Sequence, residues 1–348
     1  MAEPFEIITV PDFSGRTRYR FEARTILFLA SWMENAGAAR SLPLHIACVG
    51  EPPESVRRMA DRAGAIVTVH EHLSLGGAQG ANKLRGLDVE PRATRYLLVD
   101  TDVVFLGDVS TIGDLPDCIS AAPAAIARVP THLWKRLYAG MGLDFPEERM
   151  AMIHSEVDMP PFRREQFEHQ NRDTASSPPY YNSGVVFALW EYDLRSLWAE
   201  CMELGFRIVD RSEVGADGIV RSDQAGLALS IASLRKKGLE FRRLPDGMHA
   251  RWRHIYGGTP TPDEMQILHT TGMMNGLTSS GGFSSGHPKP LDKWLGQTRS
   301  RLLSQLRGDI RRGRPGIGIK RFRTARQRTE ELRERFIEIY QNQIVGVV

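Results

Sequence analysis

Within the first third of the chain, the sequence reads Tyr96-Leu97-Leu98-Val99-Asp100-Thr101-Asp102-Val103-Val104-Phe105-Leu106. Two carboxylates, one residue apart, interrupt a run that is otherwise almost wholly apolar. Such apolar flanks are typical of a strand buried on both faces of a parallel sheet. Two anions at the end of that strand are costly unless a positive charge compensates them, and hard oxygen ligands suit Mg²⁺ or Mn²⁺. The segment therefore indicates a metal site at the carboxyl end of a strand, where open sheets bind ligands, although Asp-x-Asp also occurs as a simple turn or helix cap.

The bulk composition is ordinary for a globular protein. The chain has 348 residues, of which 41% are hydrophobic and 25% charged, enough for one large α/β domain with an appendage or for two domains. It contains no apolar run long enough to span a membrane, and the segment 1–6 lacks the features of a secretion signal. Three widely spaced cysteines indicate buried small side chains in a reducing compartment, so we expect a cytoplasmic protein without disulfides or a zinc site.

Strand-like and helix-like segments alternate along the first hundred residues. Strands are expected over residues 5–10, 44–50 and 65–70, with helices over 19–39, 53–63 and 82–87 between and after them. This alternation predicts a doubly wound α/β sheet with the Asp pair at the end of its fourth strand. Residues 131–177 are irregular and indicate a mixed insertion or a mobile lid. Regular patterns return as strands over 180–190 and 265–268, and as helices over 194–204 and from Ser222, a candidate N-cap.

Four short patterns follow one another along the chain: Asp100-Thr101-Asp102, Asn182-Ser183-Gly184, Asp223-Gln224 and His269-x-x-Gly272. Each is weak alone, but their order resembles the retaining nucleotide-sugar transferases of glycosyltransferase family 8, which includes glycogenin and bacterial lipopolysaccharide transferases. The resemblance implies a GT-A fold, which is a single Rossmann-like α/β domain with a mixed central sheet. It would cover residues 1–295, with a nucleotide-binding half over about 1–110 and a donor-sugar and acceptor half over about 111–295. A basic helical extension over 296–348 would follow.

In this family, a divalent cation neutralises the diphosphate leaving group, and Mn²⁺ or Mg²⁺ is the expected cofactor. By resemblance, Asp102 binds the metal directly, Asp100 shares it or holds the ribose, and His269 supplies the remaining protein ligand. A histidine at a strand end is otherwise most often a surface residue or a satisfied core residue.

The resemblance also assigns residues to the donor sugar. Asn182 would bond the sugar, Ser183 and Gly184 would let the backbone approach it, and Asp223 and Gln224 would form the catalytic pair, with Gln224 near the anomeric carbon. The plainer interpretations are a turn at Asn182 and a helix start at Asp223. The remaining expected nucleotide contacts are Thr9, Val10, Asp12, Lys83, Thr101, Gly272 and Lys289.

Three departures from the family pattern affect these assignments. Lys83 stands where the family has arginine, which removes bidentate geometry toward the diphosphate. The family's Lys-Pro pair occurs only at Lys289-Pro290, so either a loop insertion separates it from His269 or the role of the lysine is lost. The segment 9–12 lacks the family's Asp-x-x-Tyr, so UDP-sugar is the expected donor and GDP-sugar the alternative.

The expected activity is metal-dependent transfer of a sugar, with retention, to a glycan, lipid-linked or protein acceptor. A haloacid dehalogenase-like phosphatase would use Asp100 as nucleophile and Asp102 as acid/base, but the motif follows three βα units instead of the first strand. A nucleotidyltransferase would need a glycine-rich phosphate loop that residues 11–15 match poorly, and a non-catalytic glycan-binding or partner-binding member is the remaining alternative. Aromatic residues that could stack on an acceptor sugar, or simply pack, are Trp134, Tyr138, Tyr180 and Trp252.

The C-terminal part of the chain is strongly basic. Between Arg299 and Arg335, 13 basic residues face 4 acidic ones, while the rest of the chain carries a net charge of −6. Residues 324–341 form an amphipathic helical pattern, with Leu332, Phe336, Ile339 and Tyr340 on its apolar face. Two interpretations stand: docking on the protein's own body or a homodimer partner, and attachment to an anionic membrane, such as the inner membrane face. No nucleic-acid motif is present.

Overall fold

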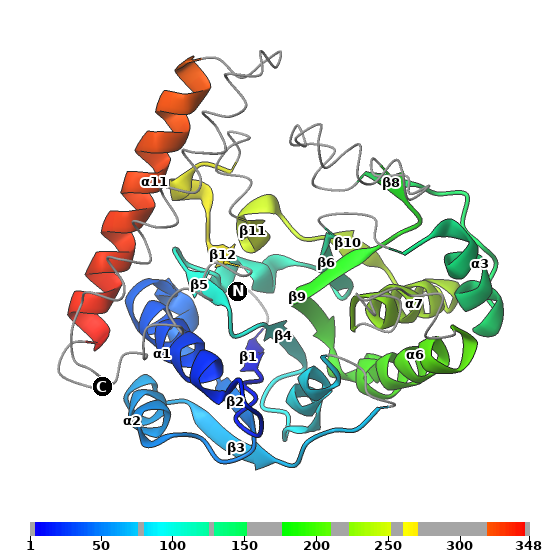
Figure 1. The fold of residues 1–348 in the computed structure, drawn as a ribbon, viewed down its shortest axis with the longest axis horizontal. Helices are drawn as coiled ribbons and strands as arrows, with labels where there is room; N and C mark the ends of the chain where they lie inside the picture. The colour runs from blue at the N-terminus through cyan, green and yellow to red at the C-terminus, as the bar shows by residue number, and fades with distance from the viewer. Residues whose placement is uncertain are drawn as a thin grey trace. The chain divides into compact units, whose positions relative to one another are not determined.

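The computed structural model of the chain describes residues 4–75, 80–124, 129–151, 176–209, 223–251, 260–270 and 319–344. Its helices are α1 (Arg18–Asn35), α2 (Glu54–Ala63), α3 (Thr131–Gly140), α6 (Leu194–Ile208), α7 (Asp223–Lys236) and α11 (Ile319–Ile339). Short 3-10 helices include η1 (Gly37–Ser41), η2 (Ala81–Asp88), η3 (Ser110–Asp114), η4 (Trp190–Tyr192), η8 (Asp246–His249) and η9 (Pro262–Glu264). The strands are β1 (Phe5–Thr9), β2 (Leu44–Val49), β3 (Ile66–His70), β4 (Arg95–Val99), β5 (Val103–Phe105), β6 (Ile119–Pro123), β7 (Met150–Ala151), β8 (Ser176–Ser177), β9 (Tyr181–Leu189), β10 (Phe241–Arg243), β11 (Ala250–Arg251) and β12 (Ile267–His269) (Figure 1).

A seven-stranded sheet carries the fold, in the order β10-β6-β9-β4-β1-β2-β3. Strand β4 is central, and it pairs in parallel with β1 and antiparallel with β9. Strand β9 also pairs antiparallel with β6, and β6 pairs in parallel with β10. All residues of β1, β4 and β9 are buried, as expected for largely apolar strands inside a sheet that is covered on both faces. The predicted α/β fold with a mixed central sheet is confirmed.

The apolar run around the Asp pair forms two strands. Strand β4 ends at Val99, Asp100 and Asp102 follow it directly as predicted, and β5 begins at Val103. Strand β5 is not part of the large sheet. It pairs antiparallel with β12 in a second sheet of order β11-β12-β5. The triplet Asp100-Thr101-Asp102 thus lies between the end of β4 and the start of β5.

Contacts divide the chain into two compact units whose segments alternate along the sequence. Unit 1 comprises Met1–Val10, His70–Val99 and Gly113–Pro245, and unit 2 comprises Pro11–Val69, Asp100–Ile112 and Asp246–Val348. The boundaries expected near residues 110 and 295 stay predictions, and the second of them lies outside the described residues.

Unit 1 contains a helix that the sequence analysis did not predict. Residues 131–177 were expected to be irregular, but α3 occupies Thr131–Gly140 and buries Leu133, Trp134, Leu137 and Tyr138, which recur at the spacing of one helical face. Residues 152–175 lie outside the described part. Trp134 and Tyr138 pack edge to face, and Trp134 packs in the same way on Tyr180. These three aromatic residues therefore serve as packing residues, and Trp252 lies outside the described residues.

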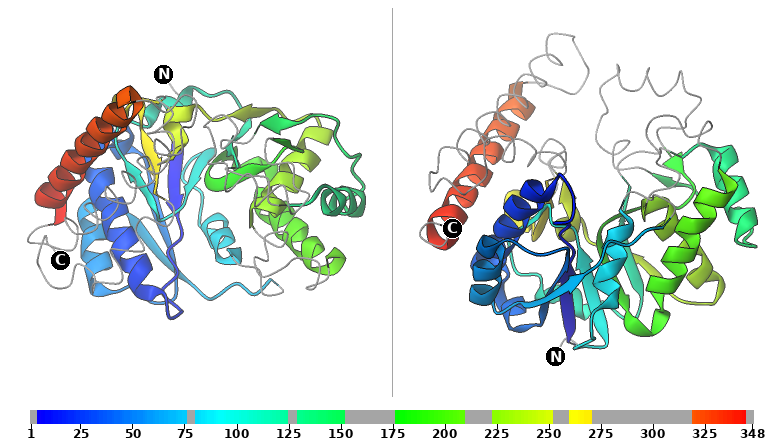
Figure 2. Two further views of the ribbon diagram at one scale, coloured as in Figure 1. Left: turned by 45° about the horizontal axis from the view of Figure 1, so that its top comes forward. Right: turned by 60° about the horizontal axis from the view of Figure 1, so that its bottom comes forward.

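The C-terminal helix belongs to unit 2, where it packs with the π-helical turn Tyr340–Ile344 against α1 (Figure 2). Its apolar face is buried, with Leu332, Phe336 and Ile339 each at most 1% exposed. Polar contacts hold its end, because Asn342 and Gln343 donate to the Glu34 carboxylate at 2.8 and 2.6 Å. For the described residues, the structure thus shows docking on the protein's own body. The helix begins at Ile319, earlier than the expected start near residue 324.

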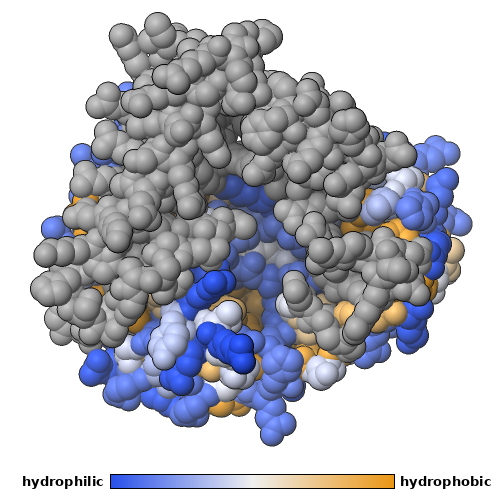
Figure 3. Space-filling view, in the orientation of Figure 1, coloured by the Kyte–Doolittle hydropathy of each residue, from blue (hydrophilic) through white to orange (hydrophobic). Residues whose placement is uncertain are grey.

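The three cysteines are buried and free of disulfides, as predicted. None of the helices in the described part of the chain is long and apolar enough to cross a membrane. On the face in Figure 3, hydrophilic and hydrophobic residues are interspersed over the described surface, and the large hydrophobic residues exposed in the described segments are Tyr19 and Val69.

Candidate functional site

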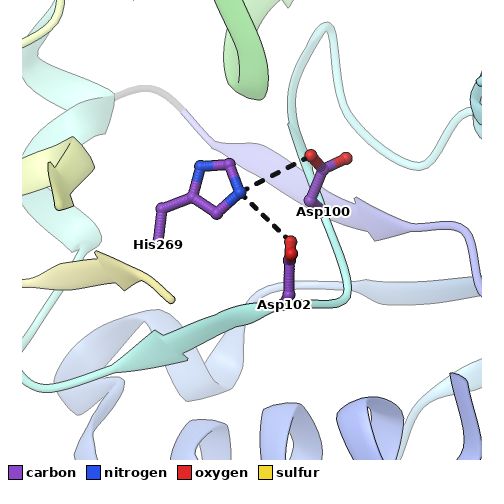
Figure 4. Close-up of side chains that lie close together, drawn as sticks. All are labelled: Asp100, Asp102 and His269. Carbon is purple, nitrogen blue, oxygen red and sulfur yellow. Dashed lines mark ion pairs between the residues drawn. The ribbon is translucent and has the colours of Figure 1, made fainter. Parts of the chain in front are cut away.

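Unit 2 contains a compact group of potential metal ligands. One ligand atom each of Asp100, Asp102 and His269 lies within 4.8 Å of the other two. The imidazole Nε2 of His269 is 3.1 Å from Oδ1 of Asp102 and 3.9 Å from Oδ2 of Asp100, so the ring points at both carboxylates (Figure 4). The three residues that sequence reasoning assigned to the metal are thus brought together, although 167 positions separate Asp102 from His269 in the chain.

The small sheet positions this group. Strands β5 and β12 pair so that His269 lies opposite Val103, the residue after Asp102. Beyond the strand end, the backbone N–H of Thr270 donates to the Asp102 carbonyl at 2.9 Å, and the Thr270 hydroxyl donates to the same oxygen at 2.7 Å. These bonds fix the backbones of Asp102 and His269 side by side, which gives their side chains a defined separation.

Burial and charge make the group suitable for a cation. The Asp102 and His269 residues are 8% and 4% exposed, so both are largely shielded from water. The Arg24 guanidinium of α1 lies 3.7 Å from Oδ2 of Asp102 and partly balances its charge. Two carboxylates and one imidazole nitrogen form a donor set that fits Mn²⁺, while Mg²⁺ prefers oxygen ligands throughout.

Unit 1 contains a second polar group, formed by Lys83, Ser183 and Asp223. The Lys83 ammonium donates to the carbonyl and the hydroxyl of Ser183, both at 2.9 Å, and to Oδ2 of Asp223 at 3.0 Å. The Ser183 hydroxyl in turn donates to the same Asp223 carboxylate. The Lys83 and Asp223 side chains are only 12% and 18% exposed, so this ion pair is well shielded.

Local backbone features hold the second group in place. Gly80 precedes η2 with a φ of +85°, and a Cβ there would lie 3.1 Å from the Asp223 carboxylate carbon, so only glycine suits this position. The Trp198 indole donates to the Asp223 carbonyl at 2.7 Å and fixes the first turn of α7. The sequence prediction that Asp223 starts a helix is confirmed for the described residues; the candidate N-cap Ser222 lies outside them.

The remaining predicted donor contacts are placed as follows. The Asn182 side chain is 7% exposed, and its Oδ1 accepts the Gly184 N–H at 2.8 Å. Asn182 lies within β9 and pairs with Ala122 of β6 at a register shift, so the plainer interpretation of a turn at this residue is wrong. Gln224 is half-buried in the first turn of α7, and Thr101 is buried beside the Asp pair. The functional roles of these residues stay predictions.

The residues at the end of β1 that were predicted to contact the nucleotide make contacts within the protein. Thr9 is fully buried, and Val10 packs against Gly86 of η2. The Asp12 carboxylate accepts bonds from the backbone N–H and hydroxyl of Ser14, at 3.0 and 2.6 Å. Two further predicted residues, Gly272 and Lys289, lie outside the described residues.

Sequence reasoning missed two residues that touch the metal group, Arg24 and His249. Arg24 is one of several arginines on α1, and no sequence feature distinguishes it. His249 lies 2.9 Å from the His269 ring, between ring nitrogens. A histidine twenty residues before a predicted ligand carries no spacing signal of its own.

A mixed α/β sheet whose Asp-x-Asp follows a central strand is the arrangement expected for GT-A glycosyltransferases. The sequence agrees, because the profile of the Rhodobacterales glycosyltransferase domain matches residues 17–235, well over half of the chain. The chain therefore belongs to this glycosyltransferase family, and the prediction of a sugar-transferring enzyme is confirmed. No curated protein sequence matches the chain.

Several solved glycosyltransferase structures resemble this fold at low identity. The bifunctional glycosyltransferase WbbM is 10% identical, with a TM-score of 0.44, and the match covers 78% of this chain and 46% of WbbM. Mouse xyloside xylosyltransferase 1 is 14% identical, with a TM-score of 0.42 and coverage of 77% and 98%. The galactosyltransferase LgtC is 11% identical, with a TM-score of 0.41 and coverage of 77% and 87%. The chain thus spans less than half the length of WbbM.

Proposed function

We propose that this glycosyltransferase is metal-dependent and moves a sugar from a nucleoside diphosphate, with UDP-sugar as the expected donor, to a glycan or lipid-linked acceptor. The observation that carries the proposal is the convergence of Asp100, Asp102 and His269 within 4.8 Å in a chain of this family. A divalent cation held there would neutralise the negative charge that develops on the leaving diphosphate.

The charge on these residues explains why a diphosphate alone would not suit the group. Asp100 and Asp102 are both acidic, so a polyanionic donor would be repelled from the carboxylates without a cation between them. The donor set of two oxygens and one nitrogen favours Mn²⁺ over Mg²⁺. We therefore expect activity with Mn²⁺ to exceed activity with Mg²⁺.

The Lys83–Ser183–Asp223 group supports a role in holding the sugar. A carboxylate whose Oδ2 already accepts from Lys83 and Ser183 is held in one orientation and can accept sugar hydroxyls with its remaining lone pairs.

In the proposed reaction, the bond between the anomeric carbon and the diphosphate oxygen breaks, and an acceptor hydroxyl oxygen forms a new bond to that carbon. The diphosphate leaves with the electron pair, and the acceptor proton passes to it. Retention then requires attack from the face of departure, because an amide such as Gln224 is too weak a nucleophile for a covalent intermediate.

Donor binding and turnover test the proposal together. With Mn²⁺ present, a UDP-sugar at 100 times its Kd should stabilise the protein by about 2.7 kcal/mol. For 348 residues this corresponds to a rise in Tm of about 4 °C. The matching sugar nucleotide should release UDP in the presence of Mn²⁺. Asp102→Asn should abolish both effects, while Asp61→Asn, at an exposed position on α2, should leave them unchanged.

Three results would contradict the proposal. Full Mn²⁺-dependent UDP release by Asp102→Asn would remove that residue from the site. Hydrolysis of p-nitrophenyl phosphate without binding of any UDP-sugar or GDP-sugar would favour the phosphatase, and donor binding without turnover would favour a non-catalytic member.

We further propose a cytoplasmic location, which the three free, buried cysteines support.

A further inference from the structure

A second histidine lies directly behind the proposed metal ligand. The Nε2 atom of His249 is 2.9 Å from Nδ1 of His269, and the two residues are 1% and 4% exposed. The Nε2 atom of His269 meanwhile faces Asp100 and Asp102. The two ring nitrogens of His269 therefore face different residues: Nε2 faces the two carboxylates, and Nδ1 faces His249.

The backbone around His249 is built to hold this contact. His249 ends η8 and leads into β11, which pairs in parallel with β12, so that Arg251 lies opposite His269. The Gln266 N–H donates to the Gly247 carbonyl at 2.9 Å. A Cβ at Gly247 would lie 2.1 Å from the carbonyl oxygen of Glu264, so only glycine allows the two segments to come this close. The close approach brings the imidazole of His249 within hydrogen-bond distance of His269.

The chemistry of an imidazole assigns the direction of this hydrogen bond when a cation is bound. A metal takes the lone pair of Nε2, so the single ring proton of a neutral His269 must then be on Nδ1. That N–H needs an acceptor, since an unsatisfied buried donor is costly. The nearest polar atom that the structure shows for it is Nε2 of His249.

Without this acceptor, the carboxylates would favour the opposite proton position. With Nε2 of His269 only 3.1 Å from Oδ1 of Asp102, a proton on Nε2 would be stabilised by a charge-assisted hydrogen bond to the carboxylate. A ring in that state has its lone pair on Nδ1, so its Nε2 atom, which faces the carboxylates, could not bind a cation there. An acceptor behind the ring is therefore needed to shift the balance toward the state that binds metal.

We propose that His249 is a positioning residue for the metal site: it accepts the Nδ1–H of His269 and so holds the His269 ring in the tautomer and orientation that bind a divalent cation. This inference rests on the proposed metal dependence. It assigns to His249 no contact with donor sugar, diphosphate or cation. Mutation of a hydrogen-bond partner behind a metal-bound histidine typically weakens metal affinity by about 10–100-fold.

The affinity for Mn²⁺ alone, measured by electron paramagnetic resonance on the full chain, tests the proposal without reference to activity. His249→Leu should raise the Kd for Mn²⁺ by about 10–100-fold. His249→Gln, which offers an amide oxygen near the position of Nε2, should recover most of the affinity. His45→Leu, at a histidine on β2 that is 1% exposed and in the same unit, should leave the Kd unchanged and controls for the loss of a buried imidazole.

The possible results separate the two proposals. If the wild-type chain does not bind Mn²⁺, the proposed metal dependence fails and the role of His249 fails with it. If the wild-type chain binds Mn²⁺ but His249→Leu binds it equally well, only the role of His249 is overturned. Equal weakening by His249→Leu and His249→Gln would also overturn it, because packing and not hydrogen bonding would then explain the effect.

A measurement on the unmutated protein covers the case in which His249→Leu does not fold. In the Mg²⁺-loaded, ¹⁵N-histidine-labelled chain, a scalar coupling across the hydrogen bond should join Nδ1 of His269 to Nε2 of His249. The proton should be assigned to His269. Absence of this coupling, or a proton assigned to Nε2 of His249, would refute the proposal.

Discussion

The ion pair between Lys83 and Asp223 gives the sharpest test of the Lys83–Ser183–Asp223 group. Lys83→Met keeps the length of the side chain but removes the ammonium, which donates to two oxygens of Ser183 and to Asp223 at 2.9–3.0 Å. Hydrogen bonds that involve a charged group contribute about 1.5–3 kcal/mol, and the shielded Asp223 carboxylate would lose its cation. We expect the free energy of unfolding to fall by about 2–3 kcal/mol.

A double-mutant cycle separates this pair from the other contacts of each residue. Asp223→Asn removes the negative charge, so adding Lys83→Met to it should cost less than Lys83→Met alone. The coupling free energy should be about 1–2 kcal/mol, within the range for residues in one polar network. Urea denaturation of the wild type, both single variants and the double variant gives the four values needed.

The donor affinity of the same variants shows whether the pair also serves the sugar site. Lys83→Arg should preserve much of the stability because it retains a cation, whereas Lys83→Met should lose the Tm rise that a UDP-sugar causes in the wild type. The reasoning would be refuted by stability changes that add within about 0.3 kcal/mol, since independent sites behave in that way. In that case, Lys83 would not act through Asp223.

Three further predictions concern packing and reactivity. Phe336→Ala should lower the free energy of unfolding by about 3–5 kcal/mol because its ring is 1% exposed, while Glu338→Ala on the exposed side of the same helix should change it by less than about 0.5 kcal/mol; equal effects in urea denaturation would show that the helix is not docked in solution. Gly226→Ala should destabilise by about 1–3 kcal/mol in the same assay, because the new Cβ would lie 2.6 Å from Met202, and an unchanged stability would contradict the close packing of α6 and α7. Burial raises the pKa of Cys48 and Cys201 to about 12, so neither forms thiolate at pH 8, and both should resist Ellman's reagent until urea unfolds the chain; rapid native labelling would contradict their burial.

Most of the secondary structure that follows local patterns could be predicted from the sequence. The strands β1, β2, β3 and β9 and the helices α1, α2 and α6 agree with the predicted segments to within a few residues, because each has a local apolar run or an apolar helical period. Pro11 after β1, Gly50 after β2 and Gly64 after α2 mark the ends of three of them. The prediction missed α3 because the Pro, Met and charged residues that follow it made the whole segment 131–177 look irregular. It also missed the separate strand β5, because Val103–Phe105 is apolar like β4 and only its pairing with β12 distinguishes it.

The same contrast holds for the Asp100–Asp102–His269 group and the contact of His249 behind it. The chemistry of the Asp pair predicted a metal site, the family resemblance added His269, and the structure brings the three side chains together. The contact of His249 with His269 depends on the pairing of β11 with β12 and on the close approach at Gly247. Contacts of this kind depend on tertiary geometry and leave no spacing pattern in one sequence.

The protein itself supplies polar partners for the Asp102 carboxylate. The Arg24 guanidinium lies 3.7 Å from Oδ2 of Asp102, and Nε2 of His269 lies 3.1 Å from its Oδ1. Arg24 therefore offsets part of the negative charge of Asp102, and a divalent cation would have to stabilise the two carboxylates further. The double charge of such a cation would stabilise the carboxylates strongly only if the ligand atoms are held in place. The fixed orientation of the His269 ring is therefore as important to the proposed site as the number of carboxylates.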